Sequence, residues 1–163
     1  MALADFIPSD GQRRIADAIT AAERHTTGEI CVHVTPRCRG NVMKRAARTF
    51  NRLHLYTTKR RNAVLIFVAY EDRKFAILGD AGINDVVPHG FWDGEVEELG
   101  RYLKVGRHVD GLCAIIARIG ERLSEFFPGE RGDENELSNE VSFDDLGDDD
   151  ELDVNDDDYG NME

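Results

Sequence analysis

The chain has 163 residues, with 20 Lys and Arg against 32 Asp and Glu, and a formal net charge of -12. Residues 129–163 hold 16 acidic residues and one basic residue, which leaves residues 1–128 with 19 basic and 16 acidic residues. A chain of that size suits a single hydrophobic core. The sequence therefore predicts one domain over residues 1–128 and a separate acidic tail over residues 129–163.

Two classes of protein are excluded early. The longest apolar run, residues 63–70, is far shorter than the roughly 20 residues that a membrane helix needs, so no membrane span is predicted. The first ten residues lack the basic and apolar regions of a secretory signal. The three cysteines are odd in number and form no Cys-x-x-Cys pair, which argues against a disulfide framework. A cytoplasmic location is expected.

The first half of the chain is predicted to alternate helix and strand. Residues 9–25 carry apolar side chains at the i, i+3, i+4, i+7 spacing of a surface helix. Residues 29–35 alternate apolar and polar side chains, as a half-buried strand does. Residues 42–54 return to helical spacing, and residues 63–70 are apolar on both faces, which is typical of a central strand.

The second half completes a mixed sheet. Residues 74–78 are a plausible hairpin partner of the central strand and are followed by a glycine-rich loop over residues 79–85. Amphipathic stretches over residues 89–102 and 110–127 read as two helices. A right-handed crossover makes the first two strands parallel, and the hairpin adds an antiparallel strand. The predicted fold is a three-layer α/β sandwich around a mixed central sheet.

The acidic tail has too few apolar groups to offset the entropy lost on ordering. We therefore expect residues 129–163 to be disordered and to make no contact with the core. A net charge of -15 against +3 for the rest of the chain predicts that the tail folds back, in a fluctuating ensemble, onto basic side chains of residues 59–61.

Two other patterns resemble functional motifs, but the residues around them do not support that function. Cys31 and Arg37 have the spacing of the Cys-x5-Arg phosphatase cradle, but the intervening Val-His-Val-Thr-Pro prefers extended strand and loses a donor at Pro36. The basic residues 59–61 have no aromatic stacking pattern or recognised motif beside them, so they read as a solvated patch and not as a nucleic-acid site.

The loop over residues 79–85 carries the main candidate site. It follows a strand, where open α/β sheets place their binding crevice. Asp80 and Asp85 supply the hard oxygen ligands that Ca²⁺ or Mg²⁺ takes, and Gly79 and Gly82 permit close approach of the backbone. The alternative is that Asp80 and its neighbours form turns and cap the next helix.

Several separated motifs resemble those of TPM domains, in the expected order and over roughly residues 6–128. The motifs are Thr26-Thr-Gly-Glu29-Ile30, Arg61-Asn-Ala-Val-Leu-Ile-Phe-Val68, Phe75-Ala-Ile-Leu-Gly-Asp80-Ala-Gly82-Ile83, Phe91-Trp92 and Asp110-Gly111-Leu112. The resemblance implies a Rossmann-like sandwich in a family, with many bacterial members, that includes calcium binders and a thylakoid-lumen protein described as an acid phosphatase. Carried over by position, it implies metal ligands at Glu29, Asp80, Asp85 and Asp110.

Two functions follow as expectations. The first is a metal-dependent phosphomonoesterase acting on a phosphorylated small molecule, with Ca²⁺ or Mg²⁺ at Asp80. The alternative is a non-catalytic module that binds a divalent cation or assembles with a protein partner. The motifs supply no obvious nucleophile, so no catalytic residue is assigned, and the oligomeric state is left open.

Overall fold

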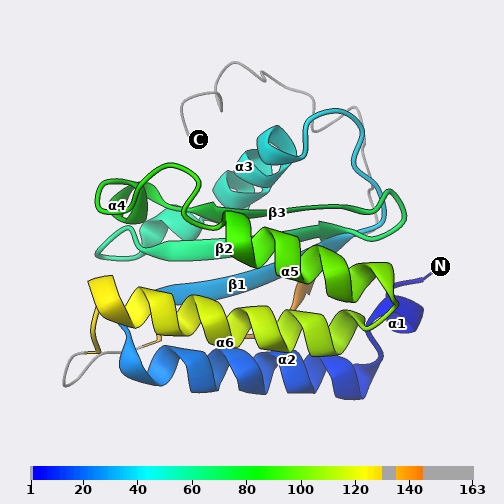
Figure 1. Cartoon of the computed structure of the whole chain (residues 1–163), viewed down its shortest axis with the longest axis horizontal. Coiled ribbons are helices and arrows are strands. Elements are labelled where there is room, and N and C mark those ends of the chain that lie inside the picture. The colour runs from blue at the N-terminus through cyan, green and yellow to red at the C-terminus, as the bar shows by residue number, and fades with distance from the viewer. Residues whose placement is uncertain (1, 130–134, 145–163) are drawn as a thin grey trace.

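Four strands form one mixed sheet in the computed structural model, which describes residues 2–129 and 135–144 (Figure 1). The strands are β1 (Glu29–Thr35), β2 (Ala63–Ala69), β3 (Lys74–Gly79) and β4 (Ser142–Phe143), in the order β3-β2-β1-β4. The strand β1 pairs in parallel with both β2 and β4, whereas β2 and β3 are antiparallel. The predicted parallel pair and hairpin are both present.

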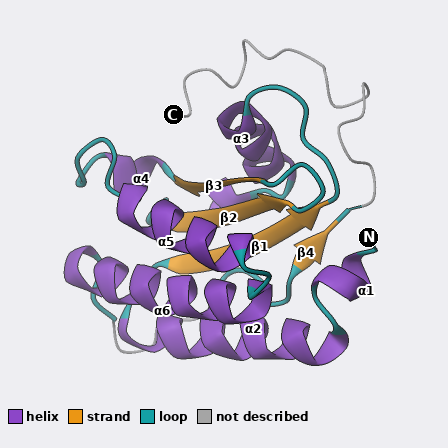
Figure 2. Ribbon diagram, turned by 45° about the vertical axis from the view of Figure 1, so that its right-hand side comes forward, coloured by secondary structure: helices purple, strands orange, loops and turns teal. Residues whose placement is uncertain are grey.

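Helices cover both faces of this sheet. One face packs against α2 (Ser9–Ala22), α5 (Asp93–Lys104) and α6 (His108–Phe126), and the other against α3 (Val42–Arg52) (Figures 1 and 2). Each face has its own cluster of buried apolar side chains. The predicted three-layer Rossmann-like α/β sandwich with a mixed central sheet is confirmed.

The alternation in β1 divides its side chains between the two layers. Ile30, Val32 and Val34 join the core beneath α2 and α6, while Cys31 joins the cluster under α3. Successive residues of a strand point to opposite faces, so His33 also lies on the α3 face. All seven residues of the strand are buried. The polar side chains on the α3 face therefore need partners inside the protein.

Several element boundaries differ from the sequence prediction. The first long helix ends at Ala22 and continues as a 3₁₀ turn, η1 (Glu23–His25). A short helix, α4 (Ala81–Asn84), lies within the predicted loop over residues 79–85. Two more short elements, α1 (Leu3–Phe6) and η2 (Leu55–Thr57), were not predicted. Short elements such as these depend on caps and tertiary contacts more than on periodicity.

The expectation that no core contact lies beyond residue 128 was wrong. Ser142 and Phe143 pair with His33 and Val34, and Val141 is 9 % exposed within the core under α2 and α6 (Figure 2). The physical reason is that β1 would otherwise be an edge strand with unpaired backbone groups. We call residues 135–144 the C-terminal segment. The disorder predicted for residues 130–134 and 145–163 falls outside the described residues.

The helices of the described residues are too short or too polar to cross a membrane.

Candidate functional site

Asp80 lies at the opposite end of the sheet from the one that the sequence suggested. It follows β3, and β3 is antiparallel to β2, so Gly79 pairs with Val64 near the start of β2. The backbone amide of Asp80 donates to the carbonyl of Ala63 at 3.0 Å. The loop therefore lies beside the amino ends of β1 and β2. The crevice rule concerns the carboxyl ends of parallel strands and does not apply to Asp80.

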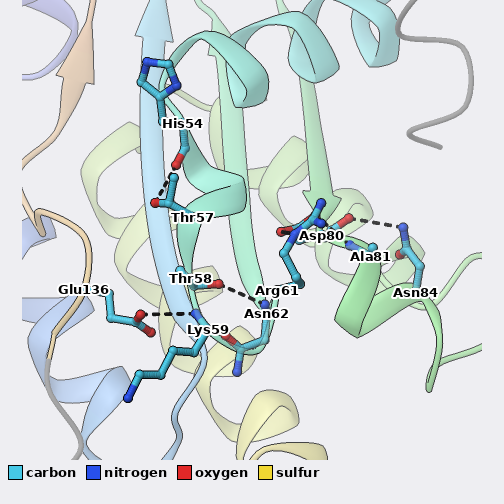
Figure 3. Close-up of polar contacts among 11 residues, drawn as sticks. His54, Thr57, Thr58, Lys59, Arg61, Asn62, Asp80, Ala81, Asn84 and Glu136 are labelled. Atoms are coloured by element: carbon cyan, nitrogen blue, oxygen red, sulfur yellow. Dashed lines mark hydrogen bonds and ion pairs between the residues drawn. The ribbon is translucent and has the colours of Figure 1, made fainter.

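The Asp80 carboxylate is buried and paired with arginine. Nε of Arg61 donates to Oδ2 at 2.8 Å, and Nη2 of Arg61 donates to Oδ1 at 2.8 Å (Figure 3). The backbone amide of Ala81 also donates to Oδ1, at 2.7 Å, which caps the first turn of α4. Asp80 therefore caps the next helix, as the alternative interpretation predicted. It also forms a bidentate ion pair with Arg61, and this hydrogen bonding raises the pKa of Arg61.

Glycine at position 82 allows the arginine to reach Asp80. A Cβ at Gly82 would lie 2.1 Å from the carbonyl oxygen of Arg60 and 2.7 Å from that of Arg61. The Gly82 amide donates to the carbonyl of Arg61 at 2.8 Å, and Arg61 has a left-handed backbone with φ of 52°. Gly82 thus permits a close approach of the backbone. The group that approaches is the loop before β2, which packs against the start of α4.

Glu29 holds the C-terminal segment. Glu29 is the first residue of β1 and is 3 % exposed. Its Oε2 accepts a hydrogen bond from the amide of Glu136 at 2.8 Å, and its Oε1 accepts one from the amide of Leu137 at 2.7 Å. Glu136 in turn accepts from the backbone amide of Lys59 at 3.2 Å (Figure 3). The described part of the tail therefore has a specific contact at Glu29, where a fluctuating ensemble was expected.

The other two predicted ligands face elsewhere. Asp110 lies in the first turn of α6 and pairs with Arg14 at 2.8 Å and with Arg107 at 3.2 Å. Hydrogen bonds from Arg14 and then Arg107 lower the pKa of this exposed carboxyl group. Asp85 is exposed at the carboxyl end of α4. Only Asp80 and Asp85 share a loop.

Cys31 offers no nucleophile. Burial, and then the negative charge of Glu23, raise the pKa of its thiol to about 12, so the thiol is protonated at neutral pH. This geometry agrees with the interpretation of Cys31 as a buried strand residue.

Comparison with known proteins identifies the family. The TPM domain family matches residues 1–122. The chain belongs to the TPM domain family. Among solved structures, the NMR structure of the BA42 protein from the psychrophilic bacterium Bizionia argentinensis has a TM-score of 0.81 and 38 % sequence identity, covering 88 % of this chain and 99 % of that one. A search of curated proteins finds no match.

The four carboxylates implied by the TPM resemblance do not share one coordination sphere. Both oxygens of Glu29 accept backbone amides, and Asp110 is paired with arginines. Within residues 2–129 and 135–144, no three His, Cys, Asp or Glu side chains are grouped to hold a metal ion. Asp80 is different, because the Arg61 guanidinium already stands beside it as a cation. Binding of Ca²⁺ or Mg²⁺ stays a prediction.

Arg61 is the residue of this TPM site that sequence reasoning missed. It was grouped with Lys59 and Arg60 as a solvated patch, although its neighbours give a local signal. An arginine two residues before an apolar strand lies at a sheet end, and the Asp-Ala-Gly turn after the antiparallel partner strand reaches the same end. A hairpin register of this kind brings the two side chains together.

Proposed function

We propose that this TPM domain is a non-catalytic binding module that takes Ca²⁺ or Mg²⁺ at Asp80 in exchange for Arg61. The observation that carries the proposal is the unequal exposure of the ion pair. The Asp80 side chain is 2 % exposed, whereas the Arg61 side chain is 48 % exposed. A carboxylate fixed in place with a solvent-facing cationic partner can exchange that partner for another cation.

The chemistry of the donors supports a hard cation. Asp80 and Asp85 supply carboxylate oxygens on one loop, and Ca²⁺ and Mg²⁺ prefer oxygen ligands. The two carboxylates also differ in burial. The buried Asp80 would fix the position of the cation, and the exposed Asp85 could adjust to it. Glu29 and Asp110 lie outside the proposed site because their oxygens serve other partners. The proposed ligand set is therefore smaller than the set implied by the resemblance.

Cation exchange should be tested by NMR titration of the full chain with CaCl₂ or MgCl₂. The acidic tail also binds cations weakly, so the readout must be local, such as the amide signals of Ala81 and Gly82. Asp80→Asn should abolish their saturable shift. Arg61→Gln removes the competitor and should raise the affinity roughly fivefold, equivalent to about 1 kcal/mol for a half-exposed pair.

Arg60→Gln is the matched control for Arg61→Gln. It removes the same charge one residue away, whereas both guanidinium hydrogen bonds to the Asp80 carboxylate come from Arg61. A smaller gain in affinity than that of Arg61→Gln separates direct displacement from general charge repulsion. Equal gains in the two variants would overturn the exchange mechanism, and a titration with no saturable shift at Ala81 would overturn the site.

Metal-dependent phosphomonoester hydrolysis is the second candidate, and Arg61 favours it. The planar fork of a guanidinium suits phosphate oxygens, so an Arg61 released from Asp80 would be placed to bind a phosphorylated small molecule. A cation at Asp80 would supply charge neutralisation of those oxygens. Binding ranks first because, among the described residues, the Asp80 carboxylate contacts a guanidinium and a backbone amide, neither of which is a nucleophile or a base at neutral pH.

Turnover of para-nitrophenyl phosphate distinguishes the two candidates. Hydrolysis that needs Ca²⁺ or Mg²⁺ and disappears in Asp80→Asn would favour the phosphomonoesterase. Local cation binding without turnover would favour the binding module.

In the NMR titration with CaCl₂ or MgCl₂, Asp85→Asn should weaken cation binding less than Asp80→Asn does, because Asp85 is exposed and not fixed.

A further inference from the structure

A second polar cluster lies at the other end of β1, on the face covered by α3. His33 and Thr35 are buried there, with the His33 side chain only 2 % exposed. Both side chains reach the same residue, Asp144 of the C-terminal segment, whose side chain is 15 % exposed. A carboxylate more than a hundred positions away in the sequence thus accepts hydrogen bonds from two buried side chains of this strand.

Three different donors converge on the Asp144 carboxylate. The carboxylate only accepts hydrogen bonds, so Nε2–H of His33 donates to its Oδ2, at 2.8 Å. Oγ1 of Thr35 donates to Oδ1 at 2.7 Å, and Nη2 of Arg52 donates to Oδ2 at 3.1 Å. Nδ1 of His33 lies 2.8 Å from Oγ of Ser142, which fixes the ring. Imidazole, hydroxyl and guanidinium together form an anion-binding donor set.

The surrounding charges keep this anion ionised. Burial alone would raise the pKa of Asp144, but the hydrogen bonds from His33 and Thr35 and the charges of His33 and Arg45 outweigh it and lower the pKa to about 2. Arg45 is 1 % exposed and lies over the ring of Phe67, with 5.8 Å between its guanidinium carbon and the ring centroid. The cluster is a hydrogen-bonded network anchored on buried side chains and not a surface pair.

The place of the cluster in the fold matches a ligand site. His33 and Thr35 lie toward the carboxyl end of β1, beside Phe67 and Ala69 at the carboxyl end of the parallel strand β2. Open α/β sheets bind ligands outside the carboxyl ends of parallel strands. The C-terminal segment enters here from outside the predicted domain, and the amide of Asp144 donates to the carbonyl of Val34 at 3.2 Å.

We propose that His33, Thr35 and Arg52 form a binding site for a carboxylate or phosphate-monoester anion, and that Asp144 occupies it as a tethered ligand. The site is distinct from the one at Asp80, which lies at the amino end of the sheet. A tether gives Asp144 an effective concentration on the order of millimolar, so an external anion competes poorly while the segment is docked. Removal of the carboxylate should make the site available to free anions.

The test is chemical rescue of Asp144→Ala in the full chain, with inorganic phosphate and formate as the probes. The urea midpoint of this variant should fall, and either anion should restore it in a saturable way that chloride at equal ionic strength does not reproduce. The ring ¹⁵N–¹H signals of His33 should shift with the same saturation. Response to formate alone assigns a carboxylate ligand, and response to phosphate alone assigns a phosphate ester.

Val141→Ala is the matched control, because it shortens a buried side chain of the same segment and keeps the Asp144 carboxylate. It should show no anion-specific rescue. Asp144→Asn serves if the alanine variant does not fold, since it keeps the shape and removes the charge; phosphate should then shift the His33 signals at lower concentration than in the unmodified chain. Equal effects of phosphate and chloride on both Asp144 variants, or equal rescue of Val141→Ala, would overturn the proposal.

Discussion

Asp80 and Asp144 are both carboxylates in ion pairs, with side chains 2 % and 15 % exposed, but their partners differ in exposure. The arginine that binds Asp80 has a side chain that is 48 % exposed, whereas Asp144 is bound by a histidine that is 2 % exposed as well as by Arg52, which is 37 % exposed. Asp80 lies at the amino end of the sheet and Asp144 toward the carboxyl end of β1. An arginine that already faces solvent regains its hydration when it leaves, although the buried Asp80 carboxylate then needs another cation, whereas a buried histidine has no such access to water.

The proposed cation exchange at Asp80 and the proposed anion site at Asp144 both rest on this difference. Loss of Arg61 leaves Asp80 with its helix-capping bond to Ala81. Loss of Asp144 leaves His33 and Thr35 without an acceptor in the interior. Removing one member of a buried network costs more than the same change at the surface.

The largest effect is expected from removing the C-terminal segment. A chain ending at residue 134 loses the buried side chain of Val141 and the acceptor for His33. Together these should lower the free energy of unfolding by on the order of 4 kcal/mol in urea denaturation. A chain ending at residue 144 retains both contacts and should lose far less. Equal stability of the two truncated chains would show that the segment contributes nothing to the fold.

The acid dependence of stability should report Asp144. Its pKa is lowered from 3.8 to about 2 in the folded protein, so its contribution is complete above about pH 4 and is lost as the pH falls toward 2. The difference corresponds to about 2 kcal/mol. Asp144→Asn should flatten the urea-denaturation profile over that pH range relative to the unmodified chain.

A smaller loss is expected for Glu29→Gln, at the amino end of the same strand. The amide oxygen can accept from only one of the backbone donors at residues 136 and 137, which leaves the other unsatisfied near a buried position. The cost should be about 1–2 kcal/mol of unfolding free energy. Glu97→Gln is the control, because the Glu97 side chain is 73 % exposed, and it should change stability by less than about 0.5 kcal/mol. Equal costs would remove any special role from Glu29.

The sheet could be predicted from the sequence where periodicity was strong. The bounds of β1 agree with the prediction because alternating side chains run between Gly28 and Pro36, two residues that break regular structure. β2 was also predicted to within one residue, from its apolar run. The strand β4 could not be predicted in this way. It is two residues long, and its pairing depends on the otherwise unpaired edge of β1 and on the burial of Val141.

The position of Asp80 directly after β3 was predicted from the sequence, but its ion-pair partner was not. An aspartate in an Asp-Ala-Gly turn has the same local pattern whether it binds a cation or caps a helix. The choice depends on Arg61, nineteen positions earlier, with a left-handed backbone that non-glycine residues rarely adopt. His33 and Asp144 are separated still further. Ion pairs of this separation become visible only when the strand register is known.

The smallest change in stability is expected for Arg61→Gln, and it tests the comparison most directly. Half of the arginine side chain is already in water, and Asp80 keeps its bond to the Ala81 amide, so the variant should lose less than about 1 kcal/mol of unfolding free energy. Because ions screen the half-exposed guanidinium of this pair, even that loss should shrink as NaCl is raised. Asp80→Ala removes the helix cap as well and should cost about 1 kcal/mol more. Urea denaturation at low and high salt measures all three values. If Arg61→Gln destabilises the protein as much as Asp144→Ala, with no dependence on salt, then Arg61 is an obligatory partner and the exchange of Arg61 for a cation fails with it.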